Sequence, residues 1–130
     1  IMPNLSTGIN LDSNFLNLKE IEIKEVRPEI EKLLVENEKI MCAFKTVRDQ
    51  VIFTNSRIFV INVKGVTGKK IAYFSYPYSK IQYYGIETAG FMDIDSELII
   101  TFSNGHILQF DFKSNVDIRM INSLISKYVL

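Results

Sequence analysis

Cysteine and histidine are almost missing from this chain of 130 residues, which contains one residue of each. A single cysteine excludes an intramolecular disulfide framework and a cysteine-rich zinc site. A single histidine excludes a metal site built from several imidazoles, and we expect no cofactor. Long apolar runs are missing too, since no segment approaches the roughly 20 apolar residues of a membrane-spanning helix. The first residues lack the basic-then-apolar pattern of a signal peptide, so we expect a cytoplasmic protein.

Net charge is absent as well, because 15 lysine and arginine residues balance 15 aspartate and glutamate residues. A balanced chain is not expected to bind nucleic acid through its overall electrostatic field. The balance conceals a difference between two parts of the chain. Residues 12–41 carry eight acidic and five basic side chains, whereas the other residues carry seven acidic and ten basic ones. The protein therefore has an acidic part followed by a basic part.

Apolar residues are plentiful, at 47% of the chain, and the length fits one domain with a hydrophobic core. Aromatic residues are distributed unevenly, because Phe15 is the one member of the nine Phe and six Tyr that precedes Phe44. Aromatic residues favour strands. The distribution therefore predicts a helical N-terminal part and a strand-rich part after it.

The N-terminal part has the spacing of an amphipathic helix between residues 18 and 35. Apolar residues recur there at steps of three and four, at Ile23, Val26, Ile30, Leu33 and Leu34. Pro28 either lies in the first turn of this helix or kinks a longer one. We expect a flexible arm over residues 1–17 and a helical segment over residues 18–36.

From residue 38 onward, short apolar runs alternate with turn residues at regular spacing, which is typical of strands. Asn104-Gly105 is the strongest hairpin signal. Because strands follow each other without helices between them, we expect an antiparallel sheet. The pattern predicts seven strands, at residues 40–47, 51–53, 58–63, 71–76, 81–88, 97–103 and 106–112.

Helical spacing returns at the end of the chain, where Ile118, Ile121 and Ile125 form an apolar stripe. We expect a helix over residues 116–129, with Ser114 or Asn115 available as the N-cap. The main domain would then span residues 37–130.

Four separate sequence motifs resemble those of small bacterial pleckstrin-homology (PH-like) proteins, in the same order along the chain. They are AFKTVRD at 43–49, VIFTNSRIFV at 51–60, GVTGKK at 65–70 and ETAGFMDIDSEL at 87–98. The resemblance covers roughly residues 18–130. It implies a mainly β fold, a PH-like barrel of two nearly orthogonal sheets with a C-terminal helix at one open end and an extra N-terminal helix. It also implies assembly into rings and no enzymatic activity.

Catalytic and metal-binding candidates are few. Cys42 lies in an apolar run, and His106, beside a hairpin turn, is the one residue that could activate it, so a catalytic pair is not expected. Asp93, Asp95 and Glu97 alternate and would share one face of a strand. They lack the spacing of a calcium-binding loop, and acids at an edge strand also serve to prevent unwanted strand pairing. We therefore expect no metal site.

Basic residues offer a second hypothesis, which is contact with an anionic lipid or phospholigand. PH domains that bind phosphoinositides use a basic cluster at the first hairpin, and here that hairpin has two bases beside Asp49. We expect such binding to be weak, because each base near an anionic surface contributes about 1 kcal/mol. The candidate residues are Lys45, Arg48, Arg57, Lys69 and Lys70.

Tyrosines cluster in a short stretch of the strand-rich part. Adjacent tyrosines in a strand point to opposite faces, so some of the rings should reach the surface. Such rings either cover the core at its edge or form an interface, where tyrosine is enriched. The candidate interface residues are Tyr73, Tyr76, Tyr78, Tyr83 and Tyr84.

These observations favour a non-enzymatic PH-like interaction module whose expected partner is itself. We expect a symmetric ring, in which the acidic and basic parts of neighbouring subunits complement each other. The alternative is a domain that binds anionic lipid or a phospholigand weakly.

Overall fold

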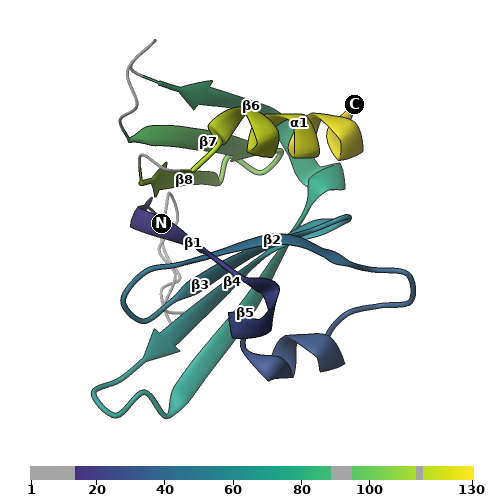
Figure 1. The fold of residues 1–130 in the computed structure, drawn as a ribbon. Helices are drawn as coiled ribbons and strands as arrows, with labels where there is room; N and C mark the ends of the chain where they lie inside the picture. The colour runs from purple at the N-terminus through teal and green to yellow at the C-terminus, as the bar shows by residue number, and fades with distance from the viewer. Residues whose placement is uncertain (1–13, 89–94, 114–115) are drawn as a thin grey trace.

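The computed structural model describes residues 14–88, 95–113 and 116–130, and within them the chain forms eight strands and one α-helix (Figure 1). In chain order the elements are β1 (Asn14–Ile21), the 3-10 helices η2 (Ile23–Glu25) and η3 (Pro28–Lys32), β2 (Ile40–Lys45), β3 (Gln50–Thr54), β4 (Arg57–Lys64), β5 (Lys70–Pro77), the 3-10 helix η4 (Tyr78–Lys80), β6 (Ile81–Glu87), β7 (Ser96–Phe102), β8 (Ile107–Phe112) and α1 (Ile118–Val129). The seven predicted strands correspond to β2–β8.

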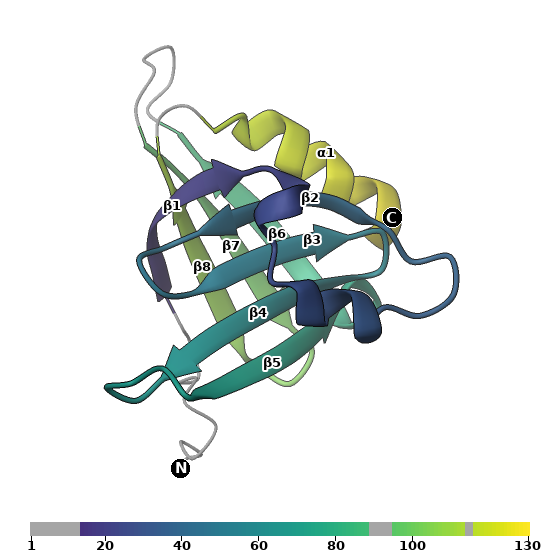
Figure 2. The same cartoon turned by 60° about the horizontal axis from the view of Figure 1, so that its bottom comes forward.

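Two antiparallel sheets, β2–β5 and β6–β8, cross each other as two layers (Figures 1 and 2). β1 joins them, because its first half pairs with β8 and its second half pairs with β2. The complete strand order is β5-β4-β3-β2-β1-β8-β7-β6. The antiparallel pairing predicted for the seven strands is confirmed, and β1, which was not predicted as a strand, pairs parallel with β8. Strands that are joined by a short turn necessarily run antiparallel. β1 and β8 come from opposite ends of the domain, so no short turn fixes their relative direction.

The helix predicted over residues 18–35 is not formed. Residues up to Ile21 belong to β1, and the rest form η2 and η3. Pro28 lies at the first position of η3, where its missing N–H costs no hydrogen bond. The apolar stripe is buried in part: Val26 and Ile30 lie in the core, whereas Ile23 and Leu33 are exposed. Residues 14–17 of the predicted arm begin β1, and residues 1–13 lie outside the described part.

Two hydrophobic clusters hold the fold together. The larger fills the space between the sheets and beneath α1, and contains edge-to-face contacts of Phe44 with Phe53 and Phe112. The smaller lies on the other face of the β2–β5 sheet, where Val26 and Ile30 cover it. The middle of this sheet is therefore buried on both faces, which explains why its strands are continuous apolar runs.

α1 begins after Asp117, whose carboxylate accepts hydrogen bonds from the N–H groups of Arg119 and Met120. Asp117 is thus the N-cap, and the expected caps Ser114 and Asn115 lie outside the described residues. The helix lies against β6, β7 and η4 (Figure 1). A hydrogen bond of 2.6 Å between the hydroxyls of Tyr84 and Ser126 fixes it to β6.

Candidate functional sites

Cys42 is buried in the core, consistent with its apolar surroundings in the sequence. Burial, with a further contribution from the charge of Glu20, raises the pKa of the Cys42 thiol to about 12. Because the thiolate is the reactive form, this cysteine is poorly suited to act as a nucleophile. His106 lies elsewhere, with its ring 5.5 Å from that of Tyr76.

Three carboxylates form a row across the second sheet. Glu97 in β7 lies directly opposite Glu87 in β6 on one side and Asp111 in β8 on the other. Partial burial, a hydrogen bond with Glu87 and the charges of Asp111 and Glu87 all raise the pKa of Glu97. The amide of Gln109 donates to both Glu97 and Asp111, which offsets part of the repulsion. In the described part of the chain, no group of three metal-ligating side chains has the geometry of a metal site, and Asp93 lies outside that part.

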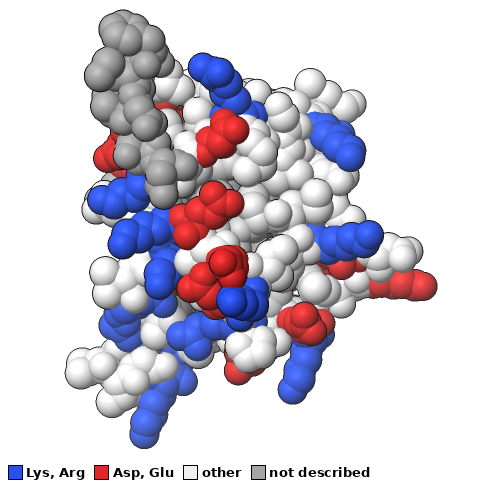
Figure 3. Space-filling model, viewed as in Figure 1, with Lys and Arg blue, Asp and Glu red and all other residues white. Residues whose placement is uncertain are grey.

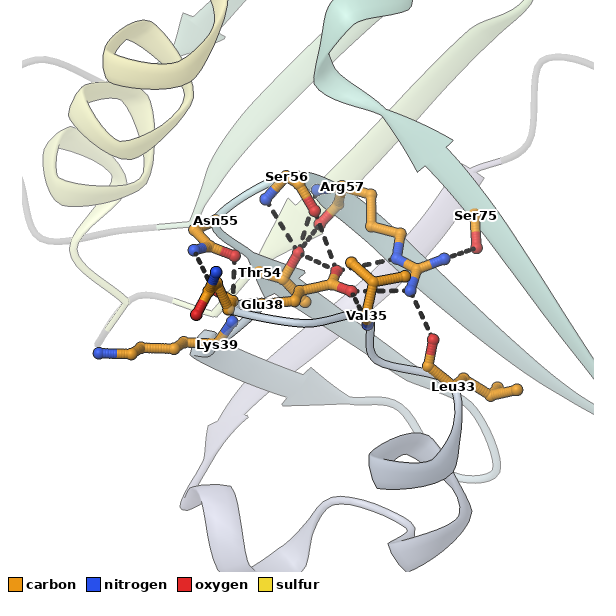
Figure 4. Close-up of polar contacts among 10 residues, drawn as sticks. Leu33, Val35, Glu38, Lys39, Thr54, Asn55, Ser56, Arg57 and Ser75 are labelled. Atoms are coloured by element: carbon orange, nitrogen blue, oxygen red, sulfur yellow. Dashed lines mark hydrogen bonds and ion pairs between the residues drawn. The ribbon is translucent and has the colours of Figure 1, made fainter.

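Glu38 and Arg57 form the most completely hydrogen-bonded pair of charges in the described residues (Figure 4). The Arg57 Nε and Nη2 groups each donate to one Glu38 carboxylate oxygen at 2.8 Å, a bidentate arrangement. The same carboxylate accepts from the Val35 N–H and from the hydroxyls of Thr54 and Ser56. The Glu38 side chain is only 1% exposed.

Burial by itself raises the pKa of Glu38, but the hydrogen bonds from Arg57, Val35, Thr54 and Ser56 outweigh it and lower the pKa to about 2. Glu38 is therefore a carboxylate at neutral pH. With five donors around it, no lone pair is left over for a ligand.

The Arg57 guanidinium is also fully engaged in contacts within the fold. Its guanidinium also donates to the Leu33 carbonyl and the Ser75 hydroxyl, and lies 4.1 Å from the centre of the Phe59 ring. The pair ties the segment before β2 to the β3–β4 turn and to β5 (Figure 4). We assign it a structural role, although a cleft of about 500 Å³ opens beside it. Sequence reasoning missed Glu38, because no local pattern links it to a partner 19 residues away.

The other predicted basic residues lie at the opposite end of the barrel. Arg48, in the β2–β3 turn, donates to the Gly65 carbonyl in the β4–β5 turn, so Lys69 and Lys70 lie close to the β2–β3 hairpin. Figure 3 shows a column of Lys and Arg side chains on the left, where Figure 1 places these two hairpins. Lys45 belongs to this end as well, and it is joined there by two lysines that sequence reasoning did not select, Lys19 and Lys113.

The five tyrosines have different environments. Tyr78 is buried, and its hydroxyl donates to the Thr54 carbonyl at 2.7 Å. Tyr76 and Tyr84 are partly buried against the core between the sheets, and Tyr73 packs against the smaller cluster on the opposite face of β5. Tyr83 is 62% exposed, so Tyr83 and Tyr84 point to opposite faces, as their adjacency predicts.

Tyrosine-rich strands β5 and β6 are the two ends of the strand order. Among the described residues, each has one strand neighbour, so one side of its backbone is not paired in the sheet. The stretches 71–76 and 81–86 contain no charged residue and no proline. Edge strands usually carry such residues as protection against pairing with other chains.

Comparison with known proteins agrees with this architecture. The sequence matches the family model described as bacterial PH domain over residues 10–129. The protein YjqA of Bacillus subtilis is 35% identical over 118 residues, which is 89% of this chain and 94% of that protein.

Two solved structures are also similar. A protein with a pleckstrin-homology domain from Shewanella loihica has a TM-score of 0.77 and 34% identity, over 88% of this chain and 99% of that one. A pleckstrin-homology domain from Shewanella amazonensis has a TM-score of 0.64 and 36% identity, and the match covers 86% of this chain and 91% of that one. In the described residues no helix is long and apolar enough to cross a membrane. With its strands, its terminal helix and its sequence matching over nearly the whole length, the chain belongs to the bacterial PH domain family.

Proposed function

We propose that this protein is a non-enzymatic interaction module that assembles with copies of itself into a closed ring through the edges of β5 and β6. The observation that carries this proposal is the pair of aromatic edges described above, which are uncharged over residues 71–76 and 81–86. An unprotected edge is a template for pairing with another chain. A second copy of this protein supplies the matching strand.

The charges that flank the two edges favour one pairing over others. Lys69 directly precedes β5, Lys70 begins it, and Glu87 ends β6. If β5 of one subunit pairs antiparallel with β6 of the next, these opposite charges meet. Glu97 and Asp111 continue the acidic row behind Glu87. Opposite charges across paired strands contribute roughly 0.2–1 kcal/mol per pair, and the partially buried acid row gains countercharges.

The difference between the two edges supports a ring rather than a simple dimer. A β5–β6 contact joins two different surfaces, so a pair of subunits keeps a free β6 edge on one subunit and a free β5 edge on the other. Such head-to-tail contacts close into rings when the rotation between neighbours allows it. Antiparallel pairing of like edges, β5 with β5 or β6 with β6, would instead leave Lys70 or Glu87 of both subunits without an opposite charge from the partner strand.

The mass of the protein in solution tests this proposal. Light scattering should give a multiple of the 15.0 kDa chain mass for the natural sequence. Gly85→Lys places a charge in the middle of β6. The fold should tolerate it, because a Cβ at Gly85 meets no atom within 4 Å in the same molecule. The charge should block pairing of this edge with another chain, so the variant should have the mass of a single chain. Val66→Lys adds the same charge at a fully exposed turn residue and should leave the assembly intact. The proposal is contradicted if the protein with the natural sequence has a light-scattering mass of 15.0 kDa at all concentrations.

A further inference from the structure

A small cavity lies at the corner where the chain passes from β5 through η4 to β6 (Figure 1). Tyr76 and Pro77 at the end of β5 and Lys80 in η4 form one side of it. Phe102 at the end of β7 and residues of the β7–β8 turn form the other side. Its volume is about 270 Å³. Both sheets contribute walls, and the cavity is complete within one chain.

Aromatic rings form the apolar part of the cavity wall. The ring centres of Tyr76 and Phe102 are 5.3 Å apart, and the centre of the His106 ring lies 5.5 Å from Tyr76 and 6.1 Å from Phe102. Phe102 is buried, and Tyr76 packs against the core between the sheets, so the protein interior holds both rings in place. Aromatic rings associate favourably with one another at such distances. A further aromatic ring in the cavity would therefore extend this group.

Backbone hydrogen bonds fix the two sides of the cavity to each other. The Lys80 carbonyl accepts from the Ser103 N–H at 3.2 Å and from the Ser103 hydroxyl at 3.3 Å. The β7–β8 turn is closed by two bonds of 2.9 Å, from the Phe102 N–H to the His106 carbonyl and from the Gly105 N–H to the Phe102 carbonyl. The cavity is thus formed before a ligand enters, which reduces the entropic cost of binding.

The polar groups at the cavity are hydrogen-bond donors. No acidic residue is among those that line it, and within the described part of the chain the Lys80 ammonium forms no ion pair. The Asn104 carbonyl oxygen accepts from the His106 N–H at 3.0 Å, which leaves the side-chain NH2 group to donate. Burial raises the pKa of Tyr76, so its hydroxyl stays protonated and is a donor as well. A ligand for this cavity must therefore supply acceptors.

We infer that this cavity binds a small aromatic carboxylate, with its ring against Tyr76 and Phe102 and its carboxylate near Lys80 and Asn104. The cavity is smaller than the roughly 300–1,000 Å³ of pockets that hold drug-sized ligands, so it accommodates one or two fused rings. An inorganic anion has no apolar surface to place against the rings, and the ammonium of Lys80 repels a cation. The ligand class thus follows from an aromatic wall combined with a positively charged, donor-rich rim.

Saturation-transfer NMR with phenylacetate and with indole-3-acetate tests the site. We expect saturable binding, with the strongest transfer to the ring protons of both probes. Phenylacetamide has the same ring without the charge, and butyrate has the carboxylate without a ring. Each should bind at least fivefold more weakly than phenylacetate, because each lacks one of the two contacts.

Lys80→Gln places the ligand in this cavity. The variant should weaken phenylacetate binding about fivefold, which corresponds to about 1 kcal/mol for an ion pair at an exposed position, and should leave phenylacetamide binding unchanged. Lys39→Gln removes an exposed lysine elsewhere and should change neither. Gly85→Lys should bind phenylacetate as the natural sequence does, so the test remains valid if the protein does not assemble.

The inference is overturned if neither aromatic acid binds saturably, or if phenylacetamide binds as tightly as phenylacetate. It is also overturned if Lys39→Gln weakens phenylacetate binding as much as Lys80→Gln does. Equal weakening of phenylacetate and phenylacetamide by Lys80→Gln would likewise contradict it, because the lysine would then act on the shape of the cavity and not on the carboxylate.

Discussion

Replacing Arg57 with methionine should be among the most damaging single changes to this protein. The variant leaves the Glu38 carboxylate, 1% exposed, without its guanidinium partner. Removing one member of a buried ion pair costs about 3–5 kcal/mol, because the remaining charge is desolvated and uncompensated. Lys24→Met is the matched control: Lys24 pairs with Glu22 at 3.3 Å, but both side chains are more than two thirds exposed. Exposed pairs contribute at most about 1 kcal/mol.

The same pair should make stability depend on pH in the acidic range. The pKa of Glu38 is about 2 in the folded protein and 4.5 ordinarily. A depressed carboxyl pKa contributes stability that is present above pH 4.5 and is lost as the pH falls toward 2. The shift corresponds to about 3 kcal/mol at neutral pH, of which about 2 kcal/mol is lost by pH 3. Glu38→Gln removes this contribution, so its stability should fall less between pH 7 and pH 3.

Urea unfolding followed by tyrosine fluorescence measures these effects, since the chain has no tryptophan. Protein concentration must be held fixed, because assembly adds to apparent stability. The reasoning is refuted if Arg57→Met costs no more than Lys24→Met. It is equally refuted if Glu38→Gln and the natural sequence lose the same stability between pH 7 and pH 3.

Three further experiments test individual features of the fold. Tyr78→Phe removes a buried hydroxyl that donates to the Thr54 carbonyl, and urea unfolding should show a loss of about 1–2 kcal/mol, whereas Tyr83→Phe at the surface should be neutral. Asp117→Ala removes the N-cap of α1 and should cost about 1 kcal/mol in the same assay. Cys42 should resist a thiol reagent at pH 8 until denaturant is added, because burial raises its pKa to about 12; rapid labelling of the folded protein would contradict this.

Local patterns were sufficient for most of the fold. The seven strands β2–β8 and α1 follow from alternating apolar residues, turn residues and helical spacing, which act over short stretches of chain. Alternation within a strand also holds in β5, where Tyr73 packs on one face and Phe74 and Tyr76 pack on the other.

The N-terminal part was predicted wrongly for a physical reason. Val26 and Ile30 have helical spacing and are buried, but Pro28 and the short apolar stripe do not sustain an α-helix. β1 forms as a strand because it pairs with β8 and with β2. The sequence of residues 14–21 contains no local pattern that indicates these distant partners.

The candidate sites show the same limit. The predicted set of bases included Arg57, whose guanidinium is held in an ion pair with Glu38. It omitted Lys19 and Lys113, which line one cleft together with Lys45. Each of these relations depends on residues brought together only by the folded chain. Charge counts along the sequence gave the acidic and basic parts, but not which charges remain without a partner.

Crosslinking between subunits tests the proposed assembly most directly. Lys70→Cys and Glu87→Cys, carried on two differently tagged chains and produced together, should form a disulfide that joins one tag to the other. Cys42 can remain, because it is buried. Antiparallel pairing of β5 with β6 predicts efficient joining of the two tags and little joining of identical chains. Absence of mixed crosslinks, or crosslinks confined to identical chains, would contradict the account.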